Sequence, residues 1–332
     1  MRKRVLLTLM VAIFIAMAST AMAEPIVIQF SHVVAVDTPK GQAAEYFKKL
    51  AEERTNGAVK VEVYPNSQLY KDKEEMEALQ LGSVQMLAPS LAKFAPLGVK
   101  EFELFDLPFI FDGYDELHKV TTGPVGKKLL DKLSAKGVLG LAYWDNGFKV
   151  MSANKPLRTP NDFKGLKMRI QSSKVLDAQM RALGAIPQVM AFSEVYQALQ
   201  TGVVDGTENP PSNLYTQKMF EVQKYVTLSN HGYLGYAVLV NKKFWEGLPQ
   251  DIRTQLESAL ADATQFANDI AKKKNDEDME SVKASGKCEV FTLTPEERAQ
   301  WKAALIPVHK EMSSRIGAEI LQEVYKETGF KM

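Results

Sequence analysis

Short blocks of apolar residues alternate along the chain with segments whose apolar residues recur at helical spacing. Residues 26–30 and 59–64 are short and apolar or alternate between apolar and polar, which is typical of strands. Residues 38–54 carry a helical pattern, and Thr38 and Pro39 match an N-cap and a first turn. Strands that alternate with helices at short intervals predict an α/β protein with largely parallel sheets.

The same two patterns continue through the rest of the chain. Asp145-Asn146-Gly147 is a turn signal and the first candidate for a crossover between two lobes. Residues 102–114 are rich in aromatic side chains, contain Pro108, and predict a packed loop. Further strands are predicted at residues 84–88, 138–144, 148–153, 167–170, 186–189, 203–207, 225–228 and 236–240, and further helices at residues 71–81, 114–120, 124–136, 173–183 and 193–200.

One predicted helix is unusually long. Residues 251–285 contain no proline or glycine, and apolar residues from Ile252 to Ile270 keep helical spacing. Such a helix measures about 50 Å at about 1.5 Å per residue, whereas a small domain is only about 30 Å across. It must therefore protrude or lie across two lobes. A coiled-coil partner helix is the competing interpretation, but residues 272–280 are dense in charge and lack an apolar seam.

The N-terminus has the pattern of an export signal. Arg2 to Arg4 form a basic start, an apolar run covers residues 5–18, and Ala21-Met22-Ala23 matches a cleavage site. We predict that residues 1–23 are a signal peptide and that the mature chain begins at Glu24. An uncleaved membrane anchor is the alternative, although the apolar run is shorter than the roughly 20 residues that a membrane span needs.

Size, charge and missing motifs narrow the function. The roughly 300 residues after the signal exceed what one core usually fills, so two domains are expected. A net charge of +1 argues against nucleic acid as a partner. The four histidines show no metal-ligand spacing, no G-x-S-x-G motif is present, and the single cysteine, Cys288, allows no internal disulfide. The sequence therefore predicts no enzyme, no metal and no cofactor.

Three blocks carry a family resemblance: GLKMRI at residues 165–170, MAFSEVYQALQT at 190–201 and VDGTENP at 204–210. In this order they resemble the periplasmic solute-binding subunits of tripartite ATP-independent periplasmic (TRAP) transporters, and the likeness covers essentially the whole mature chain. FSHVV at residues 30–34, TPKG at 38–41 and PNSQL at 65–69 are similar to the dicarboxylate-binding branch.

The resemblance implies a fold and a function. The expected fold is α/β, two-lobed, of the periplasmic binding protein type, with hinge strands and a long helix that spans both lobes. We expect residues 24–146 plus 235–274 to form lobe I, and residues 147–234 plus 275–332 to form lobe II. The implied protein is a periplasmic monomer that captures a four-carbon dicarboxylate such as succinate, fumarate or malate. It would deliver this small organic anion to two TRAP membrane subunits, driven by an ion gradient.

Three site residues follow from the resemblance. Taken alone, Arg169 would more often be a solvated charge on a strand. The resemblance implies that it forks onto the ligand carboxylate, for which a guanidinium has matched paired donors. Asn209 precedes Pro210 and would otherwise be a turn residue, but its amide is implied to hold the same carboxylate. Phe192, by pattern a core residue, is implied to line the pocket.

Four further residues are candidates. Lys149 stands where some family members have an arginine, and lysine keeps the charge but not the fork. Lys40 lies in the first turn of a helix, where it opposes the helix dipole, and a bound anion would compensate for this. We expect it to contact the distal carboxylate, although a surface lysine is the alternative. His32 and Tyr236 are candidates from their positions at the end of the first strand and in an inter-lobe strand.

Other functions remain compatible with the sequence. The bound acid could be a 2-oxoacid, a sugar acid or an aromatic acid. A periplasmic ligand sensor that presents its bound form to a signalling kinase is an alternative of another class. An enzyme that acts on a carboxylic acid is a third hypothesis, and it predicts turnover of the acid, whereas a binding protein returns its ligand unchanged.

Overall fold

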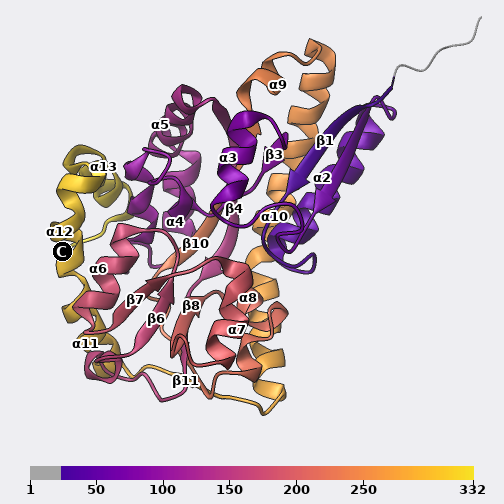
Figure 1. The fold of residues 1–332 in the computed structure, drawn as a ribbon. Helices are drawn as coiled ribbons and strands as arrows, with labels where there is room; N and C mark the ends of the chain where they lie inside the picture. The colour runs from indigo at the N-terminus through magenta and orange to yellow at the C-terminus, as the bar shows by residue number, and fades with distance from the viewer. Residues whose placement is uncertain (1–23) are drawn as a thin grey trace, which may run out of the picture.

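Two separate sheets organise the chain in a computed structural model that describes residues 24–332 (Figure 1). The predicted signal peptide lies outside the described residues. The first sheet has five strands in the order β2-β1-β3-β10-β4, and the second has six in the order β11-β9-β5-β8-β6-β7. The strands of the first sheet are β1 (Ile26–Ser31), β2 (Val59–Tyr64), β3 (Met86–Leu87), β4 (Val138–Phe148) and β10 (Tyr233–Asn241). Those of the second are β5 (Val150–Ala153), β6 (Lys167–Ile170), β7 (Ile186–Val189), β8 (Gly206–Asn209), β9 (Tyr225–Leu228) and β11 (Glu289–Thr292).

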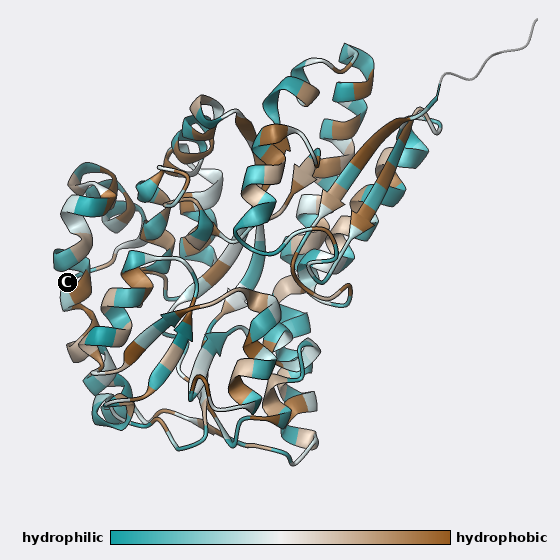
Figure 2. Cartoon of the chain, in the orientation of Figure 1, coloured by the Kyte–Doolittle hydropathy of each residue, from teal (hydrophilic) through white to brown (hydrophobic). Residues whose placement is uncertain are grey.

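Helices cover both sheets and present polar residues outward, while the strands are largely apolar (Figure 2). The helices around the first sheet include α2 (Pro39–Arg54), α3 (Glu74–Leu81), α4 (Tyr114–Thr122), α5 (Pro124–Lys132) and α9 (Lys242–Glu246). The remaining helices are α6 (Lys174–Ala182), α7 (Val195–Gln200), α8 (Pro211–Thr216), α10 (Gln250–Ala284), α11 (Pro295–Leu305), α12 (Pro307–Ile316) and α13 (Ala318–Thr328).

Local sequence signals explain where the first elements begin and end. The Thr38 hydroxyl accepts a hydrogen bond from the backbone N–H of Gly41, and Pro39 occupies the first turn of α2. After α2 the chain turns through Asn56 and Gly57, both of which have positive φ. Alternation then sets the face of β2, whose valines at the first and third positions are buried.

The long helix is confirmed as α10, with 35 residues and a length of about 52 Å. Its first half packs against α2 and β4 of the first sheet, and its second half packs against α8 (Figure 1). Leu256 and Ala263 lie in one core with Trp144 of β4, whereas Met279 and Val282 lie in another core, below the second sheet. The apolar face of α10 is therefore covered by this chain, which removes the reason to expect a coiled-coil partner.

Two expectations about the strands were wrong. Asp145, Asn146 and Gly147 form no turn but continue β4, and the chain crosses to the second sheet at Lys149, between β4 and β5. The glycine is needed for packing, because a Cβ on Gly147 would lie 2.8 Å from Nδ2 of Asn275 in α10. The sheets are also mixed rather than largely parallel, since β10 runs antiparallel to β3 and β4, and β5 runs antiparallel to β8 and β9.

Smaller differences concern element boundaries. Residues 102–114, predicted as a packed loop, begin within a 3-10 helix (Lys100–Asp106). The strand expected at residues 203–207 runs instead from Gly206 to Asn209, which places Asn209 at the end of β8. The division of the chain into lobes stays a prediction. Helix α12 contacts both the 3-10 helix and α6, and α13 contacts α4 and α5, so these two helices lie against elements of both proposed lobes.

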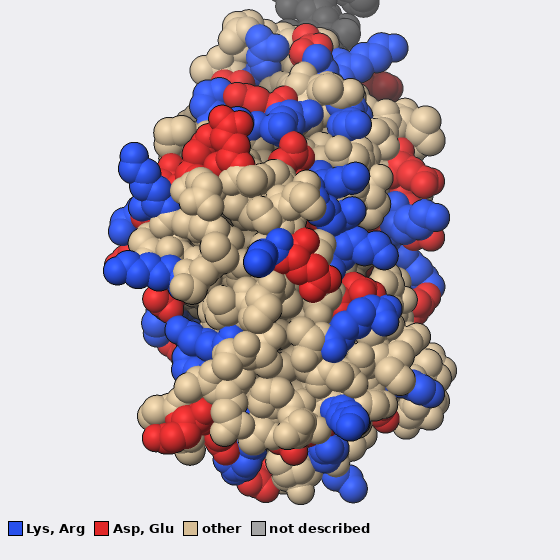
Figure 3. Space-filling view, turned by 90° about the vertical axis from the view of Figure 1, so that its left-hand side faces the viewer, with Lys and Arg blue, Asp and Glu red and all other residues tan. Residues whose placement is uncertain are grey.

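The face shown in Figure 3 has no large area of a single charge. Lysine, arginine, aspartate and glutamate side chains are interspersed over the face shown in Figure 3, as the net charge of +1 leads one to expect. Within residues 24–332, no helix combines the length and the apolar character that a membrane crossing requires.

Candidate ligand-binding site

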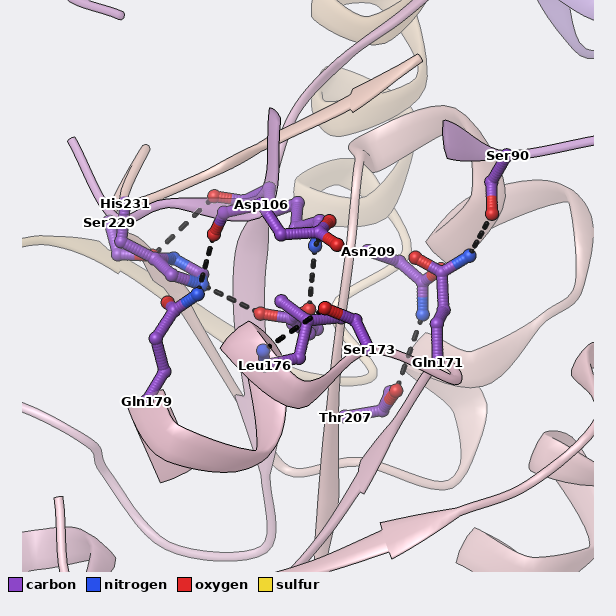
Figure 4. Close-up of polar contacts among 12 residues, drawn as sticks. Ser90, Asp106, Gln171, Ser173, Leu176, Gln179, Thr207, Asn209, Ser229 and His231 are labelled. Atoms are coloured by element: carbon purple, nitrogen blue, oxygen red, sulfur yellow. Dashed lines mark hydrogen bonds and ion pairs between the residues drawn. The ribbon is translucent and has the colours of Figure 1, made fainter. Parts of the chain in front are cut away.

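A small, partly open cavity lies between the two sheets. Its wall combines Leu234 and Tyr236 of β10 in the first sheet with Asn209 of β8 in the second, together with residues of the loops and helices next to the strands. One contact across it is visible in Figure 4, where the side-chain amide of Gln171 donates to the Ser90 hydroxyl at 2.6 Å. The wall consists of Val33, Val34, Lys40, Asp72, Ser90, Lys93, Gln171, Phe192, Asn209, Asn213, Leu234 and Tyr236.

Four of the seven predicted site residues line this cavity: Lys40, Phe192, Asn209 and Tyr236. Lys40 is 1% exposed, donates a hydrogen bond to the carbonyl oxygen of Ala88 at 2.9 Å, and lies 3.8 Å from the centroid of the Tyr236 ring. A buried ammonium that donates to a neutral carbonyl rather than to a carboxylate is costly. A ligand anion in the cavity would compensate for this charge.

Lys40 gives the site a pH dependence that can be measured. Burial, together with the nearby Lys93, lowers the pKa of Lys40 to about 7. An anion bound beside the ammonium raises that pKa, so binding above pH 7 takes up a proton. We therefore expect the affinity for a carboxylate ligand to fall by up to about tenfold per pH unit above pH 7, and Lys40 to contribute no slope well below it. Calorimetric titrations between pH 6 and pH 9 measure this.

The control for this prediction is Lys40→Met, which should bind more weakly with a flatter pH profile. An equal slope in wild type and variant would assign the titration to another group, such as Asp106, whose pKa burial raises to about 7.

Arg169 lies next to the cavity rather than in its wall. Its guanidinium is buried, and Nε and Nη2 donate to the carbonyl oxygen of Met190 at 3.1 and 2.9 Å. It also lies 5.8 Å from the centroid of the Phe192 ring, and it borders a neighbouring groove that shares Asp72, Lys93 and Gln171 with the cavity. Because arginine has five N–H donors, three remain for a carboxylate after the contacts with Met190.

A charged cluster beside the cavity escaped the sequence analysis. Lys93 forms ion pairs with Asp72 at 2.8 Å and with Glu75 at 2.5 Å, and all three side chains are largely buried. The other carboxylate oxygen of Asp72 accepts the backbone N–H of Phe192 at 2.8 Å, which joins the loop before α3 to the segment that follows β7. Burial favours the neutral carboxyl, but Lys93 and Arg169 lower the pKa of Asp72 to about 2. Asp72 and Lys93 therefore stay ionised beside the cavity, whereas burial raises the pKa of Glu75.

Lys149 and His32 do not line the cavity. Lys149 donates to Glu208 at 2.7 Å, and the other oxygen of Glu208 lies 2.9 Å from His231. Burial opposes ionisation of Glu208, but Lys149 and His231 lower its pKa to about 2. His32 is fully buried against Phe30, and burial lowers its pKa to about 3. Contact of either residue with a ligand stays a prediction.

The contribution of Asn209 also stays a prediction, although its place is suitable. It ends β8, and its amide donates to the Thr207 hydroxyl at 3.3 Å (Figure 4). The sequence analysis missed five wall residues that are polar: Asp72, Ser90, Lys93, Gln171 and Asn213. Only the charge density of residues 71–77 gave a signal, and there it matched an ordinary solvated helix.

Comparisons with known proteins agree with this arrangement. The family described as bacterial extracellular solute-binding protein, family 7, matches residues 30–315. The C4-dicarboxylate-binding periplasmic protein DctP of Rhodobacter capsulatus is 68% identical over 317 residues, which are 96% of this chain and 95% of that protein.

Two solved structures of TRAP periplasmic solute-binding proteins are also similar. The protein from Sulfurospirillum deleyianum, with bound succinate, is 49% identical with a TM-score of 0.88, and the match covers 91% of this chain and 99% of that one. The protein from Pseudomonas aeruginosa, with bound L-malate, is 47% identical with a TM-score of 0.84, and the match covers 86% and 100%. The two-lobed fold is thereby confirmed, and the chain belongs to the extracellular solute-binding protein family 7, the solute-binding proteins of TRAP transporters.

Proposed function

We propose that this chain is a periplasmic subunit that captures a four-carbon dicarboxylate and delivers it to TRAP membrane subunits. The observation that carries the proposal is the cavity between the sheets, where Lys40 is buried without a carboxylate contact and Arg169 lies beside the wall with spare donors. Two cationic groups around one small space match an anion with a carboxylate at each end. The identities with dicarboxylate-binding relatives support the same ligand class.

Binding without turnover fits the chemistry of the wall. The wall holds hydrogen-bond donors, two lysines, one aspartate and two aromatic rings, and no serine or cysteine that lines it is hydrogen-bonded to a histidine base. We propose that the chain is not an enzyme, that it works as a monomer, and that it needs neither a cofactor nor nucleic acid. Its partners are the small organic anion and the membrane subunits.

A different acid is the second candidate, because more distant relatives take larger ligands. The protein DctPAm of Advenella mimigardefordensis, 34% identical, was solved with galactonate. The higher identity to the structures solved with succinate and L-malate, 49% and 47%, favours the four-carbon dicarboxylate.

The proposal predicts which acids bind. Titration calorimetry with succinate, fumarate and L-malate should give dissociation constants near micromolar, about −8 kcal/mol, with no turnover of the acid. Galactonate and a monocarboxylate such as butyrate should bind at least about a hundredfold more weakly, because one charged contact is lost. Mass spectrometry of the ligand released from purified protein gives an independent readout. Tighter binding of galactonate than of every four-carbon dicarboxylate would refute the assignment.

A further inference from the structure

A buried polar network behind the cavity joins four elements at one residue, Asn146 of β4. Its side-chain NH2 donates to the Tyr236 hydroxyl at 2.7 Å and to Oδ1 of Asn213 at 3.0 Å. Its own Oδ1 accepts from the Ser212 hydroxyl at 2.8 Å, and its backbone carbonyl accepts from Nδ2 of Asn275 in α10 at 2.7 Å. Tyr236 and Asn213 line the cavity, whereas Asn146 does not. Asn146 is thus the common partner of two wall residues.

The direction of the hydrogen bonds made by Asn275 follows from a backbone group. The N–H of Ser212 donates to Oδ1 of Asn275 at 2.9 Å, which identifies the oxygen of that amide. The NH2 of Asn275 therefore donates to the carbonyl oxygens of Asn146 and Ala271. With Oδ1 of Asn146 facing the Ser212 hydroxyl, both hydrogens of its NH2 have their own acceptors, Tyr236 and Asn213. Every group of the Asn146 amide is satisfied in this one orientation.

This orientation decides what the two wall residues offer to a ligand. The Tyr236 oxygen accepts from Asn146, so its own O–H is available as a donor. The carbonyl oxygen of the Asn213 side chain is also occupied by Asn146, which leaves its NH2 as the free polar group. Burial raises the pKa of Tyr236, so the phenol keeps its proton. An ionised carboxylate only accepts hydrogen bonds, and it therefore matches two donors.

We propose that Asn146 is a positioning residue that presents Tyr236 and Asn213 to the cavity as hydrogen-bond donors and thereby selects a carboxylate at that end of the ligand. The inference rests on the proposed function, because it concerns one end of the dicarboxylate. Asn146 also accepts a hydrogen bond from Asn275 of α10. The position of Tyr236 and Asn213 is thereby linked to the long helix, which contacts elements of both sheets.

Asn146→Asp reverses the network with almost no change in shape. An aspartate at this position accepts hydrogen bonds only, so the O–H of Tyr236 and the NH2 of Asn213 turn toward it and leave their oxygens for the ligand. Succinate should then bind roughly tenfold to a hundredfold more weakly, because it loses two donors and meets an added negative charge. Succinamate, which has a primary amide in place of one carboxylate, can donate to these oxygens and should lose much less.

The decisive readout is therefore a ratio of affinities. Calorimetric titrations of wild type and Asn146→Asp with succinate and with succinamate should show the preference for succinate shrinking by roughly tenfold in the variant. Ser212→Ala removes the hydroxyl that orients the Asn146 amide and should shift the ratio in the same direction by a smaller factor. This variant carries the same test if Asn146→Asp does not fold.

Asn241→Asp is the matched control. Asn241 is also a buried asparagine of the first sheet, but it caps α9 and binds the carbonyl of Leu79, away from the cavity. Its replacement should leave the ratio unchanged. An unchanged ratio in both Asn146→Asp and Ser212→Ala, whatever the loss of affinity, overturns the inference and makes Asn146 a purely structural residue. Failure of the wild type to bind any dicarboxylate overturns the proposed function and the inference with it.

Discussion

Arg169→Ala should abolish measurable micromolar binding of the proposed dicarboxylate while the protein remains folded. A ligand of about eight heavy atoms that binds at micromolar strength needs about −1 kcal/mol per atom, close to the ceiling for very small ligands. Its few carbon atoms cannot supply this by apolar burial, so charge-assisted hydrogen bonds must do so. Removing one partner of a buried ion pair costs about 3–5 kcal/mol, or roughly two to four decades in affinity.

The structure adds a reason why lysine should not replace Arg169. The guanidinium is held in place by two hydrogen bonds to the carbonyl oxygen of Met190, and its remaining donors stay in one plane. An ammonium at this position cannot make the backbone contact and a paired carboxylate contact together. Arg169→Lys should therefore also bind much more weakly.

Titration calorimetry on both variants, with circular dichroism as the check on folding, measures these losses. Arg181→Ala is the matched control, because Arg181 pairs with Asp177 on the exposed side of α6. If Arg169→Ala folds and binds within about threefold of the wild type, the ligand is anchored elsewhere, since a contact of this kind contributes at least about 1.5 kcal/mol.

Lys149→Met should lower the stability of the protein by about 3–5 kcal/mol at pH 8, which corresponds to a fall in melting temperature of roughly 10 °C. The reason is that Glu208 would remain buried without its ammonium partner, 2.7 Å away in the wild type. In the variant, burial raises the pKa of Glu208 above its unfolded value. A raised pKa means stability that is present at low pH and lost as the pH rises, so the deficit should be smaller at about pH 5 than at pH 8.

A second substitution tests the cause. Lys149→Met combined with Glu208→Gln removes both charges, keeps a polar partner for His231, and should recover much of the lost stability. Lys272→Met is the control, because Lys272 forms an exposed ion pair with Asp276 on α10 and should have little effect. Unchanged thermal stability together with a tenfold loss of affinity in Lys149→Met would instead support the ligand contact that the sequence predicted.

The sequence predicted helices and strands correctly where residues close together in the chain determine them. The cap at Thr38, the alternation of β2 and the unbroken helical pattern of α10 each depend on nearby residues, and each was recovered. Asp145-Asn146-Gly147 was wrongly predicted as a turn. Small and polar residues favour turns, but they also occur in a strand where a side chain from another element packs closely against it. Gly147 makes room for Asn275, which lies 128 positions further along the chain.

The site followed the same rule. Lys40, Phe192, Asn209 and Tyr236 became candidates because they lie in recognisable blocks or at strand ends, and all four line the cavity. Asp72 and Lys93 were missed because the sequence pattern predicts that a charged residue in an amphipathic segment is exposed, even when the folded protein buries it. Whether such a residue faces water or a cavity depends on the second sheet, which packs over it only in the folded chain.

The order of strands in the first sheet has a consequence for the time course of folding. β10 lies between β3 and β4, so residues 233–241 complete a layer whose other strands end by residue 148. A ribosome that adds about 5–20 residues per second needs several seconds to make the intervening stretch. During that interval β3 and β4 have no partner between them, and the hydrophobic face that β10 later covers stays uncovered. The second sheet, by contrast, can pair β5 with β8 and β9 before β10 is made, so these three strands can be in place before the first sheet is complete.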